Sequence, residues 1–167
     1  MEARTLARQR THGLTKARAA REQVLLFRVG GEVYGIGLHA LWEVLLPEGV
    51  TGLPTPPYQV CTALAYRGRR LPLIRMSELF GILAERVPLT SRVLLIQAQG
   101  RPLGLLVDEV LEMIEVESAA LAPVPALATL LRSEIFRGLF RRGERIILVV
   151  SEEGLGGLQE VGQFYGG

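Results

Sequence analysis

Residues 61–74 read CTALAYRGRRLPLI, and the pattern on either side of Gly68 predicts a β-hairpin. Two runs of strand-forming residues flank this glycine, with arginines at positions 67, 69 and 70. Glycine readily adopts the positive backbone angles of a tight turn, so we expect the chain to reverse at Gly68. Pro72 has no N–H group and is expected where the second strand can spare one.

The same unit of strand, glycine turn and strand occurs three more times along the chain. The other turns are expected at Gly30-Gly31, at Gly100 and at Gly143, each between two β-type apolar runs. Helical spacing of apolar residues predicts one helix over 76–83, and residues 117–134 predict one or two short helices broken by prolines. Many short strands with glycine turns are typical of small β-barrels rather than a doubly wound sheet.

The charge distribution separates a basic start from the rest of the chain. Residues 1–22 hold six basic and two acidic side chains, a net charge of +4, whereas the remaining 145 residues carry a net charge of −2. A body with negative net charge is a poor binder of phosphate backbones. A basic β-barrel that binds nucleic acid therefore stays only as an alternative.

The inventory of chemically active residues favours a binding protein over an enzyme. The 167 residues contain one cysteine, Cys61, and two histidines, so we expect no disulfide framework and no zinc site. No phosphate-binding glycine loop and no nucleophile elbow occurs in the sequence. We therefore expect no catalytic residue, no metal and no cofactor. Without a secretory signal or a membrane-spanning apolar run, the expected location is the cytoplasm.

Four segments, in order and at ordinary spacing, resemble the CheW-like chemotaxis coupling family. They are LLFRVGGEVYGIGLHALWEVL (25–45), CTALAYRGRRLPLIRMSELFG (61–81), GRPLGLLVDEVLEMIEV (100–116) and FRGLFRRGERIILVV (136–150). Within the second segment, Arg67, Gly68 and Pro72 match the family's Leu-Arg-Gly-x-x-x-Pro pattern in kind and spacing. The resemblance spans roughly residues 23 to 152.

This resemblance implies a mainly β fold of two small five-stranded SH3-like barrels packed together, with a few short helices. It implies a basic tail over 1–22, a CheW-like domain over 23–152 and a glycine-rich C-terminal tail over 153–167. It also implies a non-enzymatic scaffold that couples chemoreceptors to a CheA-type histidine kinase in chemotaxis signal transduction. The expected partners are the regulatory domain of the kinase and the cytoplasmic tip of the receptors, without nucleic acid or direct membrane insertion.

The resemblance further implies a set of partner-binding residues. They are Leu41, Glu43, Val44, Thr62, Arg67 and Gly68. On residue chemistry alone, Arg67 and Glu43 form only an exposed ion pair, whereas the resemblance makes them part of the partner surface. Thr62 replaces a glycine of the family pattern, and Ala65 replaces its asparagine. These departures keep open a divergent adaptor of a chemosensory pathway that controls pilus motility.

Three further segments are interpreted from composition. The basic start is a disordered extension or an amphipathic helix with little apolar surface. The segment Leu53-Pro54-Thr55-Pro56-Pro57 is a stiff connection between strands or a polyproline-like ligand. The glycine-rich end is expected to be mobile, with Phe164 and Tyr165 docking back onto the body.

Overall fold

The computed structural model describes residues 20–47, 59–82, 87–125 and 133–166. The interpretations of the basic start and of the proline-rich segment over 53–57 therefore lie outside the described residues, as does part of the segment over 117–134.

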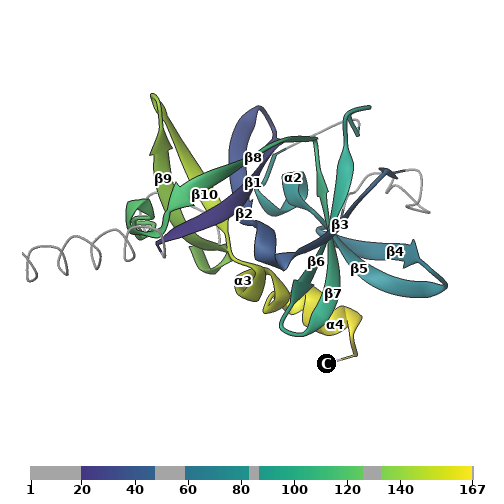
Figure 1. Ribbon diagram of the computed structural model, residues 1–167. Coiled ribbons are helices and arrows are strands. Elements are labelled where there is room, and N and C mark those ends of the chain that lie inside the picture. Colours follow the sequence, from purple (N-terminus) through teal and green to yellow (C-terminus); the bar gives the residue numbers. More distant parts are fainter. Residues whose placement is uncertain (1–19, 48–58, 83–86, 126–132, 167) are drawn as a thin grey trace, which may run out of the picture.

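In the described part of the chain, ten strands form two five-stranded sheets, which Figure 1 shows side by side. The first sheet has the order β8-β1-β2-β10-β9 and comprises β1 (Arg21–Val29), β2 (Glu32–Gly37), β8 (Glu109–Glu117), β9 (Phe136–Arg142) and β10 (Arg145–Val150). The second sheet has the order β3-β6-β7-β5-β4 and comprises β3 (Leu41–Leu45), β4 (Cys61–Tyr66), β5 (Arg69–Arg75), β6 (Arg92–Ala98) and β7 (Arg101–Val107). The mainly β fold is thus confirmed, although within the described residues each expected barrel is a curled sheet whose edge strands do not pair as a ladder.

All four expected hairpins are confirmed by antiparallel pairing of β1 with β2, β4 with β5, β6 with β7 and β9 with β10. In the β4–β5 turn, Arg67 and Gly68 have φ values of 46° and 75°, the pair of positive angles that a two-residue type I′ turn requires. Beyond the turn, the parallel pairing of β5 with β7 begins at Leu73, one residue after Pro72. The missing N–H of Pro72 therefore precedes that ladder.

We call each sheet, together with the side chains that it encloses, a lobe. The two lobes are built on the same plan, and they exchange one strand. Each sheet joins two hairpins through a parallel pair, β2 with β10 in the first and β7 with β5 in the second. The fifth strand comes from the other side of the molecule: β3 follows β2 along the chain but pairs with β6, and β8 follows β7 but pairs with β1. Neither lobe is therefore complete without a strand that the chain delivers from the other.

The apolar side chains of the central strands alternate between a lobe's interior and a core shared by both lobes. In β1, Val24 and Leu26 belong to the interior of the first lobe, while Leu25, Phe27 and Val29 belong to the shared core. In β6, Val93 and Leu95 line the interior of the second lobe, while Leu94 and Ile96 face the shared core. Burial on both faces explains why these strands read as continuous apolar runs.

Short helices connect and cover the sheets. They are the 3-10 helices η1 (Leu38–Ala40), η3 (Ser118–Ala120) and η4 (Ser133–Ile135), and the α-helices α2 (Met76–Leu79), α3 (Glu152–Gly156) and α4 (Gln159–Phe164). Helix α2 is shorter than the predicted 76–83, because Gly81 adopts a φ of 71° that is incompatible with a continuing helix. None of the helices in the described part of the chain is long and apolar enough to cross a membrane.

The expectation of a mobile glycine-rich end is wrong for residues 152–166. This segment forms α3 and α4, which follow β10 and run along the lower part of the molecule beside β6 and β7 in Figure 1. Leu155, Leu158 and Val161 enter the shared core, so apolar burial offsets the flexibility of the glycines. The expected docking of Tyr165 is confirmed, because its hydroxyl donates a hydrogen bond to the Pro102 carbonyl at 2.6 Å and its ring lies under the Arg101 guanidinium.

A polar contact ties the start of α3 to the crossover between the lobes. His39 Nε2 in η1 lies 2.8 Å from Glu152 Oε1. Burial by itself would raise the pKa of Glu152, but the hydrogen bond to His39, a backbone N–H and the charges of His39 and Arg137 together lower it below its ordinary value of 4.5. The folded state therefore favours ionised Glu152.

Acidification is expected to weaken this contact. A carboxyl group whose folded-state pKa is lowered stabilises the fold above its unfolded pKa, and this contribution is lost as the pH falls through the folded value. We expect the free energy of unfolding of the wild type to decline more steeply below about pH 4.5 than that of Glu152→Gln. Urea unfolding at several pH values measures both slopes. Glu153→Gln, at the exposed neighbouring position, should follow the wild type. Equal slopes for wild type and Glu152→Gln would contradict the assignment.

Candidate functional site

The two edges of the second sheet meet through side chains at the β4–β5 turn. The Tyr66 hydroxyl donates a hydrogen bond to Glu43 Oε2 at 2.6 Å, and an Arg67 guanidinium nitrogen lies 3.9 Å from the same oxygen. The Arg67 guanidinium also lies 5.1 Å from the centre of the Tyr66 ring, within cation–π range. Glu43 belongs to β3 and Tyr66 to β4, so these contacts bridge strands at opposite ends of the sheet order. We call Glu43, Tyr66 and Arg67 the edge cluster.

The edge cluster is polar and open to solvent. The hydrogen bond to Glu43 is the main cause that raises the pKa of Tyr66, with desolvation adding to it and the Arg67 charge opposing it. The side chain of Arg67 is 76% exposed, which limits the internal ion pair to about 0–1 kcal/mol. Most of the guanidinium's hydrogen-bonding capacity therefore remains available to a partner.

Trp42 lies beside the edge cluster at a β-bulge in β3. The pairing of β3 with β6 shifts between Leu41, opposite Ile96, and Glu43, opposite Leu95, which leaves Trp42 as the extra residue. Trp42 is 56% exposed, and two more large apolar residues are also exposed, Val44 on the same strand and Leu46 directly after it. The bulge thus places an exposed tryptophan on an edge strand next to a charged cluster.

The other predicted partner-binding residues have different environments. Val44 is 42% exposed beside Glu43, and Gly68 is exposed in the turn next to Arg67. Leu41 is half-buried against the shared core, so its side chain faces inward. Thr62 is half-buried on β4, and its buried hydroxyl oxygen has no hydrogen-bond partner within the described residues. The structure therefore brings Glu43 and Arg67 within ion-pair range, with Gly68 beside Arg67 in the turn and Val44 next to Glu43 along the edge strand β3.

The sequence analysis did not single out Trp42 and Tyr66, although both lie beside Glu43 and Arg67 in the structure. Tyr66 stands where the family pattern has a leucine, and a phenol near a carboxylate is a natural hydrogen-bond donor. Trp42 is the only tryptophan in the chain, and it directly precedes Glu43. A lone tryptophan beside a charged residue in a short strand is a signal for a binding surface, because tryptophan is enriched among the residues that dominate interfaces.

The motif around Asp108 has a structural role. Its Oδ2 accepts a hydrogen bond from the Gly30 backbone N–H at 2.8 Å, and its backbone N–H donates to the Arg28 carbonyl at 2.9 Å. The neighbouring Glu109 instead pairs with the Arg28 guanidinium at 2.6 Å. Asp108 thus fixes the β1–β2 turn against the end of β7, where the chain crosses between the lobes.

The described residues contain no group of three or more histidine, cysteine, aspartate or glutamate side chains arranged to hold a metal ion. Burial raises the pKa of the Cys61 thiol to about 11, with the Glu160 charge adding to the effect and a backbone hydrogen bond from Leu73 opposing it. At neutral pH this thiol is protonated and therefore a poor nucleophile.

Two curled sheets around a shared core, with a tryptophan and a charged cluster exposed on one edge, are typical of a module that binds other proteins. Comparison with known proteins supports this class. The CheW-like domain family matches residues 23–159. Because this match covers most of the chain, the chain belongs to the CheW-like domain family.

Individual relatives are similar over most of their lengths. Chemotaxis protein CheW of Helicobacter pylori is 26% identical over 131 residues, which cover 78% of this chain and 79% of that protein. Chemotaxis protein CheW of Rhizobium meliloti is 27% identical over 128 residues, covering 77% and 83%. The crystal structure of scaffolding protein TtCheW from Thermoanaerobacter tengcongensis has a TM-score of 0.72 at 23% identity and covers 83% of this chain and 94% of that one. These relatives support a chemotaxis coupling scaffold and favour neither the pilus adaptor nor the nucleic-acid-binding barrel.

Proposed function

We propose that this protein is a non-enzymatic scaffold that couples chemoreceptors to a CheA-type histidine kinase. The edge cluster, together with the exposed Trp42, is the observation that carries this proposal. A scaffold acts by holding partners together, so the proposed role requires neither a reaction nor a cofactor. The protein acts in the cytoplasm, where the receptor tips and the kinase would be accessible to it.

The proposed partner surface comprises Leu41, Glu43, Val44, Thr62, Arg67 and Gly68, extended by Trp42 and Tyr66. Trp42 and Val44 supply apolar area that is desolvated on binding, and Arg67 supplies a guanidinium for an acidic group of the partner. Arginine and tryptophan are the residue types that most often dominate binding energy. Leu41 and Thr62, whose side chains are half-buried, support the strands that present this surface.

The direct test is assembly from purified parts. We expect the protein to co-elute with the kinase's regulatory domain and with a receptor's cytoplasmic fragment. When all three components are mixed, we expect them to form one complex. A parallel titration with random double-stranded DNA should show no binding at physiological salt. Failure to bind either protein fragment, at concentrations where each fragment is folded, would contradict the proposed function.

Trp42→Ala should weaken assembly without unfolding the protein. Truncation of a central tryptophan at an interface typically costs about 2 kcal/mol or more, or roughly thirtyfold in the dissociation constant. Because Trp42 is more than half exposed, its loss should change the free energy of unfolding little. Met113→Ala, at an exposed apolar residue on β8 of the other sheet, is the matched control and should bind normally. Equal loss in both variants would show that Trp42 is not a specific contact.

A further inference from the structure

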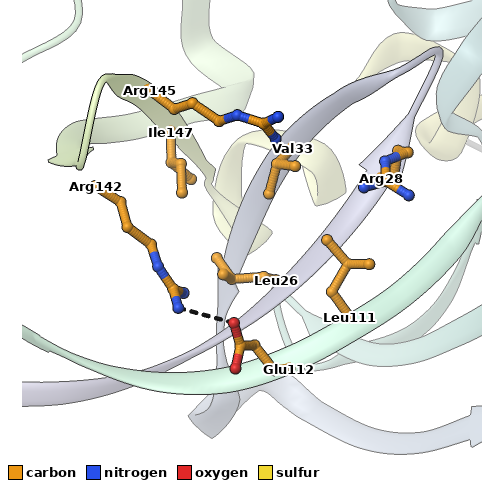
Figure 2. A pocket seen from close by; sticks show the side chains of 8 residues that line it. All are labelled: Leu26, Arg28, Val33, Leu111, Glu112, Arg142, Arg145 and Ile147. Carbon is orange, nitrogen blue, oxygen red and sulfur yellow. Dashed lines mark hydrogen bonds and ion pairs between the residues drawn. The ribbon is translucent and has the colours of Figure 1, made fainter.

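The first lobe contains a cavity of about 210 Å³ between the β1–β2 hairpin, the β9–β10 hairpin and β8 (Figure 2). It is built by the first sheet, whereas the edge cluster is built by β3 and β4 of the second sheet. The cavity is therefore separate from the proposed partner surface.

Two irregularities of the backbone open the sheet at this place. The parallel ladder between β2 and β10 begins only at Tyr34 and Leu148, so Val33 and Ile147 lie before the two strands are joined. On the other side, the pairing of β1 with β8 shifts between Leu25 and Phe27, which sets Leu111 and Glu112 of β8 opposite one residue of β1. Bulges of this kind bend the strand and disrupt the ladder locally, and they are common beside active sites.

The cavity combines an apolar floor with a cationic rim. Its apolar lining comes from four residues of four strands, Leu26, Val33, Leu111 and Ile147. Figure 2 shows the guanidinium-bearing side chains of Arg28, Arg142 and Arg145 around them, with Glu112 as the acidic lining residue. The site thus places three arginine side chains around a surface that favours an apolar group.

Of these three arginines, only Arg145 lacks an ionic partner within the described residues. Arg28 pairs with Glu109 at 2.6 Å, and Arg142 pairs with Glu112 at 2.8 Å. The Arg145 guanidinium has no ion pair or side-chain hydrogen bond within residues 20–47, 59–82, 87–125 and 133–166. The Arg142–Glu112 pair is exposed on both sides, with side chains 42% and 63% accessible, so it can rearrange at little cost.

We propose that this cavity binds a small free carboxylic acid with an apolar body, with Arg145 holding the carboxylate and the four apolar residues contacting the body. Arginine is suited to this task because its planar guanidinium accepts a carboxylate through two parallel hydrogen bonds. The cavity is smaller than the about 300–1,000 Å³ of sites for drug-sized ligands, so the occupant is a short-chain acid with one ring or one branched chain.

The test uses 3-phenylpropanoate as the probe and 3-phenylpropanamide as its neutral counterpart. Titration into the ¹⁵N-labelled full chain, followed by NMR, should shift the Arg145 side-chain N–H resonance and the backbone amides of Val33, Leu111 and Ile147. A charge-assisted hydrogen bond distinguishes the two probes, so the acid should bind at least about tenfold more tightly than the amide.

Arg145→Gln should remove the preference for the acid while leaving the weak apolar binding common to both probes. Arg141→Gln is the matched control, because Arg141 lies on the neighbouring strand and does not line the cavity. Each variant's amide spectrum reports whether it is folded. Equal binding of acid and amide to the wild type, or an acid preference that survives in Arg145→Gln, would overturn the proposal. Binding of an acetylated Phe-Glu dipeptide amide without binding of the free acid would also overturn it, and would assign the cavity to a protein segment.

Discussion

Gly154→Ala is expected to destabilise the fold strongly. An added Cβ at this position would lie 1.9 Å from the Glu134 carbonyl oxygen and 2.8 Å from the Glu134 carbonyl carbon, both of them backbone atoms. Since backbone cannot rotate away as a flexible side chain can, α3 must shift against η4. Overpacking typically costs about 1–3 kcal/mol, and a clash with backbone places this variant at or above the upper end of that range.

The same shift would disturb contacts that hold α3 in place. The Gly154 N–H donates to the Ser151 hydroxyl at 3.0 Å, the cap that begins the helix, and Ser151 N–H donates to the Ile135 carbonyl at 2.6 Å. Leu155, the next residue, is fully buried in the shared core. The loss should therefore appear in global unfolding, as a fall of about 6–12 °C in the thermal midpoint for about 3 kcal/mol.

Gly162→Ala provides the matched control. Gly162 lies within α4, and an added Cβ would meet no atom within 4 Å. Alanine at an unhindered helical position stabilises by about 0.5–1 kcal/mol relative to glycine. Thermal melts of both variants should thus shift in opposite directions from the wild type. A Gly154→Ala midpoint within a degree or two of the wild type would show that α3 does not pack closely on η4.

The hairpins could be predicted from the sequence because each is a local event. Gly30-Gly31, Gly68, Gly100 and Gly143 each lie between two adjacent apolar runs, and all four adopt turns with positive φ. Such a turn needs only the residues on either side of it, so neighbouring sequence is sufficient. The family resemblance then supplied how the hairpins combine into two sheets, which composition and periodicity alone did not provide.

The exchange of β3 and β8 between the lobes was not predictable from the residues, since the choice of partner strand is made at long range. The strand β3 is separated from its partner β6 by two strands and a connecting segment, and nothing in Leu41–Leu45 specifies β6 rather than β2.

The helices at the end of the chain were misjudged for a related reason. Their glycines indicated flexibility, while the apolar residues at 155, 158 and 161 find their partners only in the assembled shared core.

The candidate site was predicted in part. Glu43 and Arg67 were placed together through the resemblance, and the structure brings their charged groups within ion-pair range. Tyr66 and Trp42 were missed because their roles depend on curvature of the sheet and on a bulge. Both are properties of the folded sheet, and a residue pattern within one strand does not encode them.

Arg67→Glu is expected to weaken binding to the kinase or receptor fragment far more than it weakens the fold. Arg67 is an exposed turn residue, and such substitutions usually change the free energy of unfolding by no more than about 0.5 kcal/mol. Its positive φ of 46° strains arginine and glutamate alike, so melting curves compare only the side chains. A charged contact that becomes buried on binding typically costs about 2–5 kcal/mol when it is lost.

A charge swap separates the two possible roles of the residue. The single variant places a carboxylate beside Glu43, whereas Arg67→Glu combined with Glu43→Arg restores a pair of opposite charges at the same two positions. If the pair only supports the fold, the double variant should recover wild-type binding. If Arg67 contacts a partner directly, as we propose, binding should stay weak while the melting curve recovers. Arg70→Glu makes the same change in net charge on the same hairpin, at an exposed residue opposite Ala65, and should bind normally. Calorimetric titration of the four proteins against each fragment decides between these outcomes, and unaltered affinity of Arg67→Glu for both fragments would exclude Arg67 from the partner surface.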